Sequence, residues 1–223
     1  MSIGPLNPTR AFRRRARCLA HATSGVALIE FALSLPILMI IGIGGFEVAN
    51  YAVTHMRVAQ VAATLADNSS RFSEEVVGRQ SRMREADVEQ AFFGAASQAG
   101  NLDLKDNGRI ILSSLELNEQ EGQYIHWQRC WGDAPYNSSY GEEGDGKHGR
   151  SVRGMGPPGQ RFMAAENLPV MFVEVVYNYQ PLALGMFIPD VPIRKIAGMY
   201  VRDDRDVTRI YPSAGITPAK CNS

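Results

Sequence analysis

The sequence predicts an α+β protein in which a long N-terminal helix, first transmembrane and then amphipathic, packs on a small antiparallel sheet. Three observations support this fold class. An apolar segment occupies residues 26–48, a helical repeat of apolar residues continues to residue 66, and a period of two, typical of strands, begins near residue 109. A chain of 223 residues suits one membrane helix and one domain.

The apolar segment is long enough to cross a bilayer. Sixteen uncharged residues separate Glu30 from Glu47, and these glutamates are the only charged residues in the segment 26–48. At about 1.5 Å per residue the segment spans about 34 Å, whereas a hydrocarbon core is about 30 Å thick. A secretory signal peptide has a shorter apolar stretch followed by a small-x-small cleavage site, which is missing here. We therefore expect a signal anchor.

The distribution of charge predicts the orientation of this anchor. Residues 1–25 contain five arginines and no acidic residue, which by the positive-inside rule leaves a cytoplasmic basic leader and places residues 49–223 outside. The whole chain has 23 basic and 23 acidic residues, so residues 26–223 have 23 less 5, or 18, basic residues against 23 acidic ones. This net charge of −5 argues against nucleic acid as a partner of the outer domain.

Glu30 is unusual because a carboxylate at the centre of a membrane costs about 2.5 to 3.5 kcal/mol, and less near the interface. In one interpretation it stays hydrated at the level of the headgroups. However, Gly25, Val26, Glu30 and Phe31 together resemble the processing site of type IV pilin-like precursors. In that site a prepilin peptidase cuts after the glycine, and the glutamate becomes the fifth residue of the mature chain. Cleavage of this sequence would fall between Gly25 and Val26.

The residues around this motif resemble one family within that superfamily. Residues 25–38, followed by residues 45–47 and an alanine-rich helix to residue 66, are similar to the opening of TadE-like proteins. These are the pseudopilins of tight-adherence (Flp) pilus systems. Residues 111–116, Trp127 and residues 173–179 show a more diffuse similarity.

The resemblance implies a pilin-like fold and a non-enzymatic role in pilus assembly, in the bacterial inner membrane with a periplasmic C-terminal domain. The implied partners are other pilin or pseudopilin subunits, inner-membrane assembly proteins, the prepilin peptidase and membrane lipid. Glu30 would then act in assembly by pairing with the new amino group of Val26, in its own or a neighbouring subunit.

Two alternatives give Gly25 and Glu30 no such role. The chain could be an uncleaved single-pass anchor that carries a periplasmic binding or enzymatic domain, or a secreted enzyme that has lost its apolar segment. We identify no Ser-His-Asp, Cys-His or paired-carboxylate pattern and therefore predict neither catalytic residues nor a cofactor. His126 and His148 lack a ligand partner at metal-binding spacing, which predicts no metal site, and His55 is expected to be packed and hydrogen-bonded in the core.

The three cysteines fall in different compartments under this topology. Cys18 belongs to the cytoplasmic leader, whereas Cys130 and Cys221 face an oxidising periplasm. We therefore predict a disulfide between Cys130 and Cys221; the alternative is two unpaired cysteines.

The pattern beyond the membrane predicts two helical segments and four strands. The first helix continues to residue 66 with an apolar stripe that carries a sheet, and a second helix covers residues 85–98. Residues 110–118 and 123–130 form a hairpin in which Ile125, Trp127 and Arg129 share a face. Residues 170–179 form the clearest strand, residues 196–201 form the last one, and a polar tail follows.

A long loop is predicted for residues 132–160, which are rich in glycine, proline and serine. The glycine pattern at residues 154–159 lacks a preceding strand and a following helix, so nucleotide binding is not predicted. An acidic group in the same stretch lacks the spacing of a calcium-binding loop, and the loop is therefore expected to be solvated. This group comprises Asp133, Glu142, Glu143 and Asp145.

Overall fold

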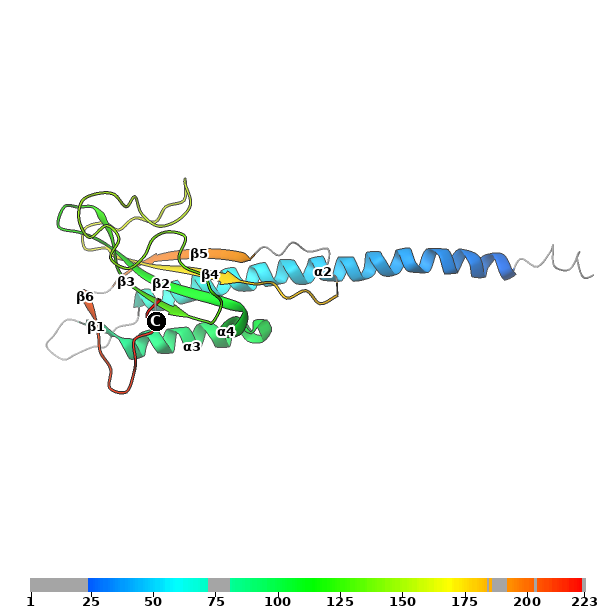
Figure 1. Cartoon of the computed structure of the whole chain (residues 1–223), viewed down its shortest axis with the longest axis horizontal. Coiled ribbons are helices and arrows are strands. Elements are labelled where there is room, and N and C mark those ends of the chain that lie inside the picture. Colours follow the sequence, from blue (N-terminus) through cyan, green and yellow to red (C-terminus); the bar gives the residue numbers. More distant parts are fainter. Residues whose placement is uncertain (1–23, 72–80, 184, 186–191, 203, 222–223) are drawn as a thin grey trace, which may run out of the picture. The chain divides into compact units, whose positions relative to one another are not determined.

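The computed structural model describes residues 24–71, 81–183, 185, 192–202 and 204–221 (Figure 1). The leader arginines and Cys18 lie outside the described residues. The chain divides into two units between Val48 and Ala49, and each is described here by itself. The helical elements are α2 (Ser24–Arg71), α3 (Glu85–Ala99), a 3₁₀ turn (Gly100–Leu102) and α4 (Leu104–Asn107), and the strands are β1 (Ser81–Arg84), β2 (Gly108–Leu117), β3 (Gln123–Trp131), β4 (Val170–Tyr177), β5 (Ile193–Tyr200) and β6 (Arg205–Tyr211).

The first unit consists, in its described part, of the first half of α2. The large apolar side chains of this half are exposed, by between 39% for Ile43 and 71% for Leu28. Among the described residues, α2 is the one helix long and apolar enough to cross a membrane. Exposed apolar side chains on a helix of this length are what a hydrocarbon solvent requires. The predicted N-terminal helix is therefore confirmed, and its composition fits a membrane-anchored protein.

The second unit is built on an antiparallel sheet with the strand order β3-β2-β4-β5. The hairpin of β2 and β3 pairs Ile111 with Cys130, and β4 lies on the other side of β2, with Ile111 opposite Glu174. The predicted α+β class, the hairpin and the strand at residues 170–177 are confirmed. The polar tail, in contrast, contains β6, which pairs in parallel with β1 in a separate two-stranded sheet that the sequence pattern did not predict.

Residues 49–71 of α2 and the whole of α3 cover one face of the four-stranded sheet (Figure 1). The apolar stripes of both helices meet the alternate apolar residues of β2 and β4 in one core. Its best-buried members include Val58 and Leu65 on α2, Val88 and Phe92 on α3, and Ile110, Leu112, Val173 and Val175 on the sheet. The predicted packing of the long helix on the sheet is therefore correct.

The loop between β3 and β4 covers part of the opposite face of the sheet. Most of residues 132–160 are exposed or half-buried, as predicted, but Met155 is buried against the sheet, which the prediction of a solvated loop did not include. Leu115, Ile125 and Phe172 form a second core with Met155 and Ala164 of the loop segment, all nearly inaccessible to solvent. The side-chain amide of Gln123 fixes the loop to the sheet, because it forms two hydrogen bonds with the backbone of Ala164, at 2.7 and 3.0 Å. The second face of the sheet thus combines this apolar core with buried polar side chains, among them Ser113 and Glu174.

A β-bulge at His126 corrects the predicted face of the hairpin. Ser114 pairs with Trp127 and Leu115 pairs with Ile125, so His126 has no partner in the ladder. An extra residue in one strand inverts the alternation beyond it. As a result Trp127 lies in the helix-covered core, whereas Ile125 lies in the loop-covered core. The expectation that Ile125 and Trp127 share a face is wrong.

Candidate functional site

The predicted processing site lies in the first two turns of α2. Gly25, Val26, Glu30 and Phe31 are all exposed, and the Gly25–Val26 peptide bond belongs to the first turn, since the helix begins at Ser24. Val26 and Glu30 are four residues apart and therefore share a helix face. The predicted cleavage position therefore lies at the N-terminal end of α2 as the structure describes it.

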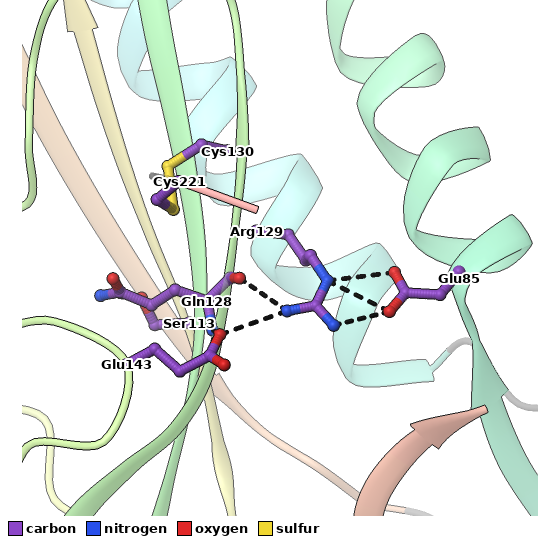
Figure 2. Close-up of polar contacts among 7 residues, drawn as sticks. All are labelled: Glu85, Ser113, Gln128, Arg129, Cys130, Glu143 and Cys221. Carbon is purple, nitrogen blue, oxygen red and sulfur yellow. Dashed lines mark hydrogen bonds and ion pairs between the residues drawn. A yellow bond between two sulfur atoms is a disulfide. The ribbon is translucent and has the colours of Figure 1, made fainter. Parts of the chain in front are cut away.

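A cluster of charged side chains in the second unit lies at the β3 edge of the sheet (Figure 2). Arg129 projects from this strand to Glu85, the first residue of α3. Its Nε lies 3.0 and 3.2 Å from the two Glu85 carboxylate oxygens, and its Nη2 donates to Oε1 at 2.6 Å. The two side chains are only 8% and 5% exposed. This bidentate pair joins α3 to the sheet.

The same guanidinium also reaches the loop layer. Its Nη1 donates to the Gln128 carbonyl at 2.8 Å and to Glu143 Oε2 at 3.3 Å. Glu143 Oε2 in turn accepts the backbone N–H of Gln128 at 2.9 Å. Glu143 therefore anchors the loop to the outer edge of β3, while its side chain stays 44% exposed, as expected for a solvated acidic group. We call Glu85, Arg129 and Glu143 the edge clamp.

Cys130 and Cys221 form a disulfide beside the edge clamp, as predicted (Figure 2). The Cys130 N–H donates to the Ala219 carbonyl at 2.7 Å, and Arg109 Nη2 donates to the Cys221 carbonyl at 3.0 Å. Glu143 and the C-terminal tail thus satisfy exposed amides of β3, which would otherwise form a free sheet edge open to another strand.

Two further buried charges have structural partners. Glu174 on β4 is fully buried and accepts hydrogen bonds from Ser138 Oγ at 3.0 Å, from the Ser139 N–H at 3.1 Å and from Arg194 on β5. Arg205 at the start of β6 donates to the Ser69 and Ser70 carbonyls in the last turn of α2. A cation at this position satisfies carbonyls that have no partner within the helix and complements the helix dipole.

The bulge residue His126 is held by a carboxylate. Its Nδ1 lies 2.9 Å from Glu116 Oε2, and Tyr124 stacks against the ring with centroids 5.3 Å apart. The hydrogen bond to Glu116, the charges of Glu116 and Glu143, and the Val207 carbonyl raise the pKa of His126 above its usual value, although burial opposes the shift. His126 therefore gains a proton more readily than a free histidine.

His55 departs from expectation in one respect. It packs edge-on against Tyr51, with ring centroids 4.4 Å apart, but its Nε2 is buried without a hydrogen-bond partner in the described structure. Burial, followed by the charge of Lys195, lowers the pKa of His55, so the neutral ring is favoured. Within the described residues no three His, Cys, Asp or Glu side chains are grouped to hold a metal ion.

Comparison with known families gives a match over the N-terminal segment. Residues 25–67 match the family model of TadE-like proteins. The match confirms the resemblance read from the opening residues and points to tight-adherence pilus systems. No match was found among curated proteins or among solved structures.

The TadE-like segment contains all four residues of the predicted processing site but none of the edge clamp. Sequence reasoning missed Glu85 and Arg129 because they are 44 residues apart and neither belongs to a recognised motif. The one feature of the sequence that pointed to this ion pair was Arg129, at a predicted strand position next to Cys130.

Proposed function

We propose that this protein is a minor pseudopilin or pilus-assembly protein of a tight-adherence (Flp) type IV pilus, and that a prepilin peptidase cleaves it between Gly25 and Val26. The observation that carries the proposal is the TadE-like match over residues 25–67, which includes the glycine and glutamate on a helix apolar enough to span a membrane. In this proposal the leader is cytoplasmic, the anchor lies in the inner membrane and residues 49–223 are periplasmic.

Glu30 has a specific role in the proposed assembly. Cleavage would create an ammonium group at Val26, where the positive end of the helix dipole disfavours a cation. Glu30 lies one turn away on the same face and supplies the opposite charge. A carboxylate without a cation is costly in lipid, so packed helices are stable only in a register that brings Glu30 to an ammonium group of its own or a neighbouring subunit.

The described part of the outer unit supports a mechanical rather than a catalytic role. Among its described residues, the buried carboxylates Glu85, Asp87 and Glu174 are each held by an arginine. The edge clamp and the disulfide connect α3, the sheet, the loop layer and the C-terminal tail. Such cross-links suit a domain that keeps its shape while its anchor is packed among other subunits, which would be pilins, pseudopilins or inner-membrane assembly proteins.

The first experiment determines the N-terminal residue and intact mass of the protein purified from membranes, with and without a co-expressed prepilin peptidase. We expect a mature chain that begins at Val26 only when the peptidase is present. A chain that keeps its leader beside an active peptidase would contradict the proposal and favour an uncleaved single-pass anchor.

The second experiment tests the role of Glu30. Glu30→Gln removes the charge and preserves the shape, and we expect cleavage to continue while recovery of the protein with assembled pili falls at least tenfold. Ser34→Ala is the matched control, because Ser34 lies on the same face one turn further and donates only to the Phe31 carbonyl, at 3.2 Å. Normal assembly of the Glu30→Gln variant would refute the proposed register.

A further inference from the structure

The loop between β3 and β4 contains a pocket of about 440 Å³ that the proposed function does not use. Pockets of this size, within the range of about 300 to 1,000 Å³, accommodate small ligands. Its lining combines two arginines, three hydroxyl groups and proline rings, and it includes no carboxylate. The residues that matter here are Arg153, Arg161, Ser139, Tyr140, Ser151 and Pro158.

Arg153 and Arg161 are both exposed and donate no hydrogen bond to any other described residue. Arg150, in the same loop, differs. Its Nη2 pairs with Glu121 at 2.9 Å and its Nε donates to the Gln120 carbonyl at 2.8 Å. The two arginines of the pocket thus keep their donors available, whereas the neighbouring arginine is already engaged.

The backbone of the loop holds these arginines at one place. Met155 and Phe162 exchange two backbone hydrogen bonds, at 3.0 and 2.8 Å, which bring Arg153 and Arg161 to the same pocket. Gly154 adopts a φ of +97°, and a Cβ there would lie 2.4 Å from the Phe162 carbonyl oxygen. Glycine is therefore required for the close approach of the two chain segments.

The loop segment around the pocket is positively charged, whereas the outer domain as a whole is negatively charged. Residues 146–165 contain four basic residues and no acidic one, whereas residues 49–223 as a whole contain 18 basic and 21 acidic residues, a net charge of −3. Burial, followed by the charge of Glu174, raises the pKa of Tyr140. Its hydroxyl therefore stays protonated and can donate a hydrogen bond to a ligand.

We propose that this pocket binds an acidic saccharide. Each guanidinium presents paired donors that match a carboxylate or a sulfate ester. The hydroxyls of Ser139, Ser151 and Tyr140 match sugar hydroxyl groups, and Pro158 offers an apolar surface to a sugar ring. Nucleic acid fits less well, because a phosphate backbone calls for a longer row of cations than two arginines. The proposal goes beyond pilus assembly and does not rest on it.

Isothermal titration calorimetry with the full chain in phosphatidylcholine nanodiscs tests this proposal. The probes are trigalacturonate, which carries three carboxylates, neutral maltotriose, inorganic phosphate and a short single-stranded oligonucleotide. We expect trigalacturonate to bind and maltotriose not to bind. The double variant Arg153→Gln/Arg161→Gln should weaken trigalacturonate binding at least tenfold, and Arg150→Gln, which removes the same type of charge nearby, should change it less than twofold.

Several results would overturn the proposal. Unchanged trigalacturonate affinity in the double variant, or no binding by the wild type, would exclude the pocket. An equal loss in Arg150→Gln would indicate general charge attraction. Phosphate or oligonucleotide binding at least as tight as that of trigalacturonate would exclude an acidic saccharide as the preferred ligand. An unchanged urea midpoint in each variant verifies that its fold is intact.

Discussion

The edge clamp supplies the sharpest test of how the outer domain is held together. Arg129 is 8% exposed and Glu85 5% exposed, and three donor–acceptor contacts of 2.6 to 3.2 Å join them. Removing one partner of such a pair leaves a buried charge and costs about 3 to 5 kcal/mol of the free energy of unfolding. We therefore expect Arg129→Leu and Glu85→Leu each to lose that amount.

The double variant should behave differently, because an apolar pair leaves no buried charge. We expect it to lose less than the sum of the single losses, with a coupling free energy of about 2 kcal/mol or more. Glu143 is 44% exposed and can remain hydrated when Arg129 is replaced. Urea unfolding of the full chain in neutral detergent, followed by tryptophan fluorescence, measures these differences, since the Arg129 Cζ lies 5.9 Å from the Trp127 ring centroid.

The Arg150–Glu121 pair is the matched control. Its donor–acceptor distance is 2.9 Å, but its side chains are 67% and 82% exposed. Solvent screens such a pair, so the same cycle of leucine substitutions should give a coupling of at most about 1 kcal/mol. Strict additivity of the Arg129 and Glu85 variants, or equal coupling in the two cycles, would refute the reasoning that burial makes the edge clamp strong.

Three other predictions concern the outer domain. The disulfide closes a loop with a sequence separation of 91. In the chain-entropy description, the Cys130→Ser/Cys221→Ser variant should therefore lose about 4 to 5 kcal/mol of unfolding free energy. Urea unfolding of the oxidised and reduced wild type checks this value, and equal unfolding midpoints would contradict it. Because folding raises the pKa of His126 above its ordinary value of 6.5, the protonated ring should stabilise the fold fully below that pH and progressively less as the pH rises through the raised pKa. The stability advantage of wild type over His126→Gln should therefore be larger at pH 5.5 than at pH 8, and an advantage that grows with pH would show that the sign is wrong. Arg205→Met removes the donor to the Ser69 and Ser70 carbonyls. It should lower the free energy of unfolding by about 1 to 3 kcal/mol and speed amide hydrogen exchange in the last turn of α2. Unchanged exchange in that turn would exclude the capping role.

Much of the fold could be predicted because local patterns report local structure. The stripe of Val58, Ala62 and Leu65 indicated a helix that packs on a sheet, and the alternation of Met171, Val173 and Val175 indicated a strand with a buried face. The disulfide followed from the expected topology together with the redox compartment. Each of these inferences depends on residue type and spacing along a short segment, or on the compartment in which the segment lies.

The sequence by itself determined the apolar anchor with its TadE-like opening at Gly25 and Glu30, the helix that continues from it, and the alternation of the main strands. Only the tertiary structure decided that His126 is the extra residue of a bulge, that Glu85 meets Arg129, and that the loop with Arg153 covers the second face of the sheet. The physical reason is that periodicity reflects neighbours along the chain, whereas a bulge, a buried ion pair and a packed loop depend on which distant segments the folded backbone brings together.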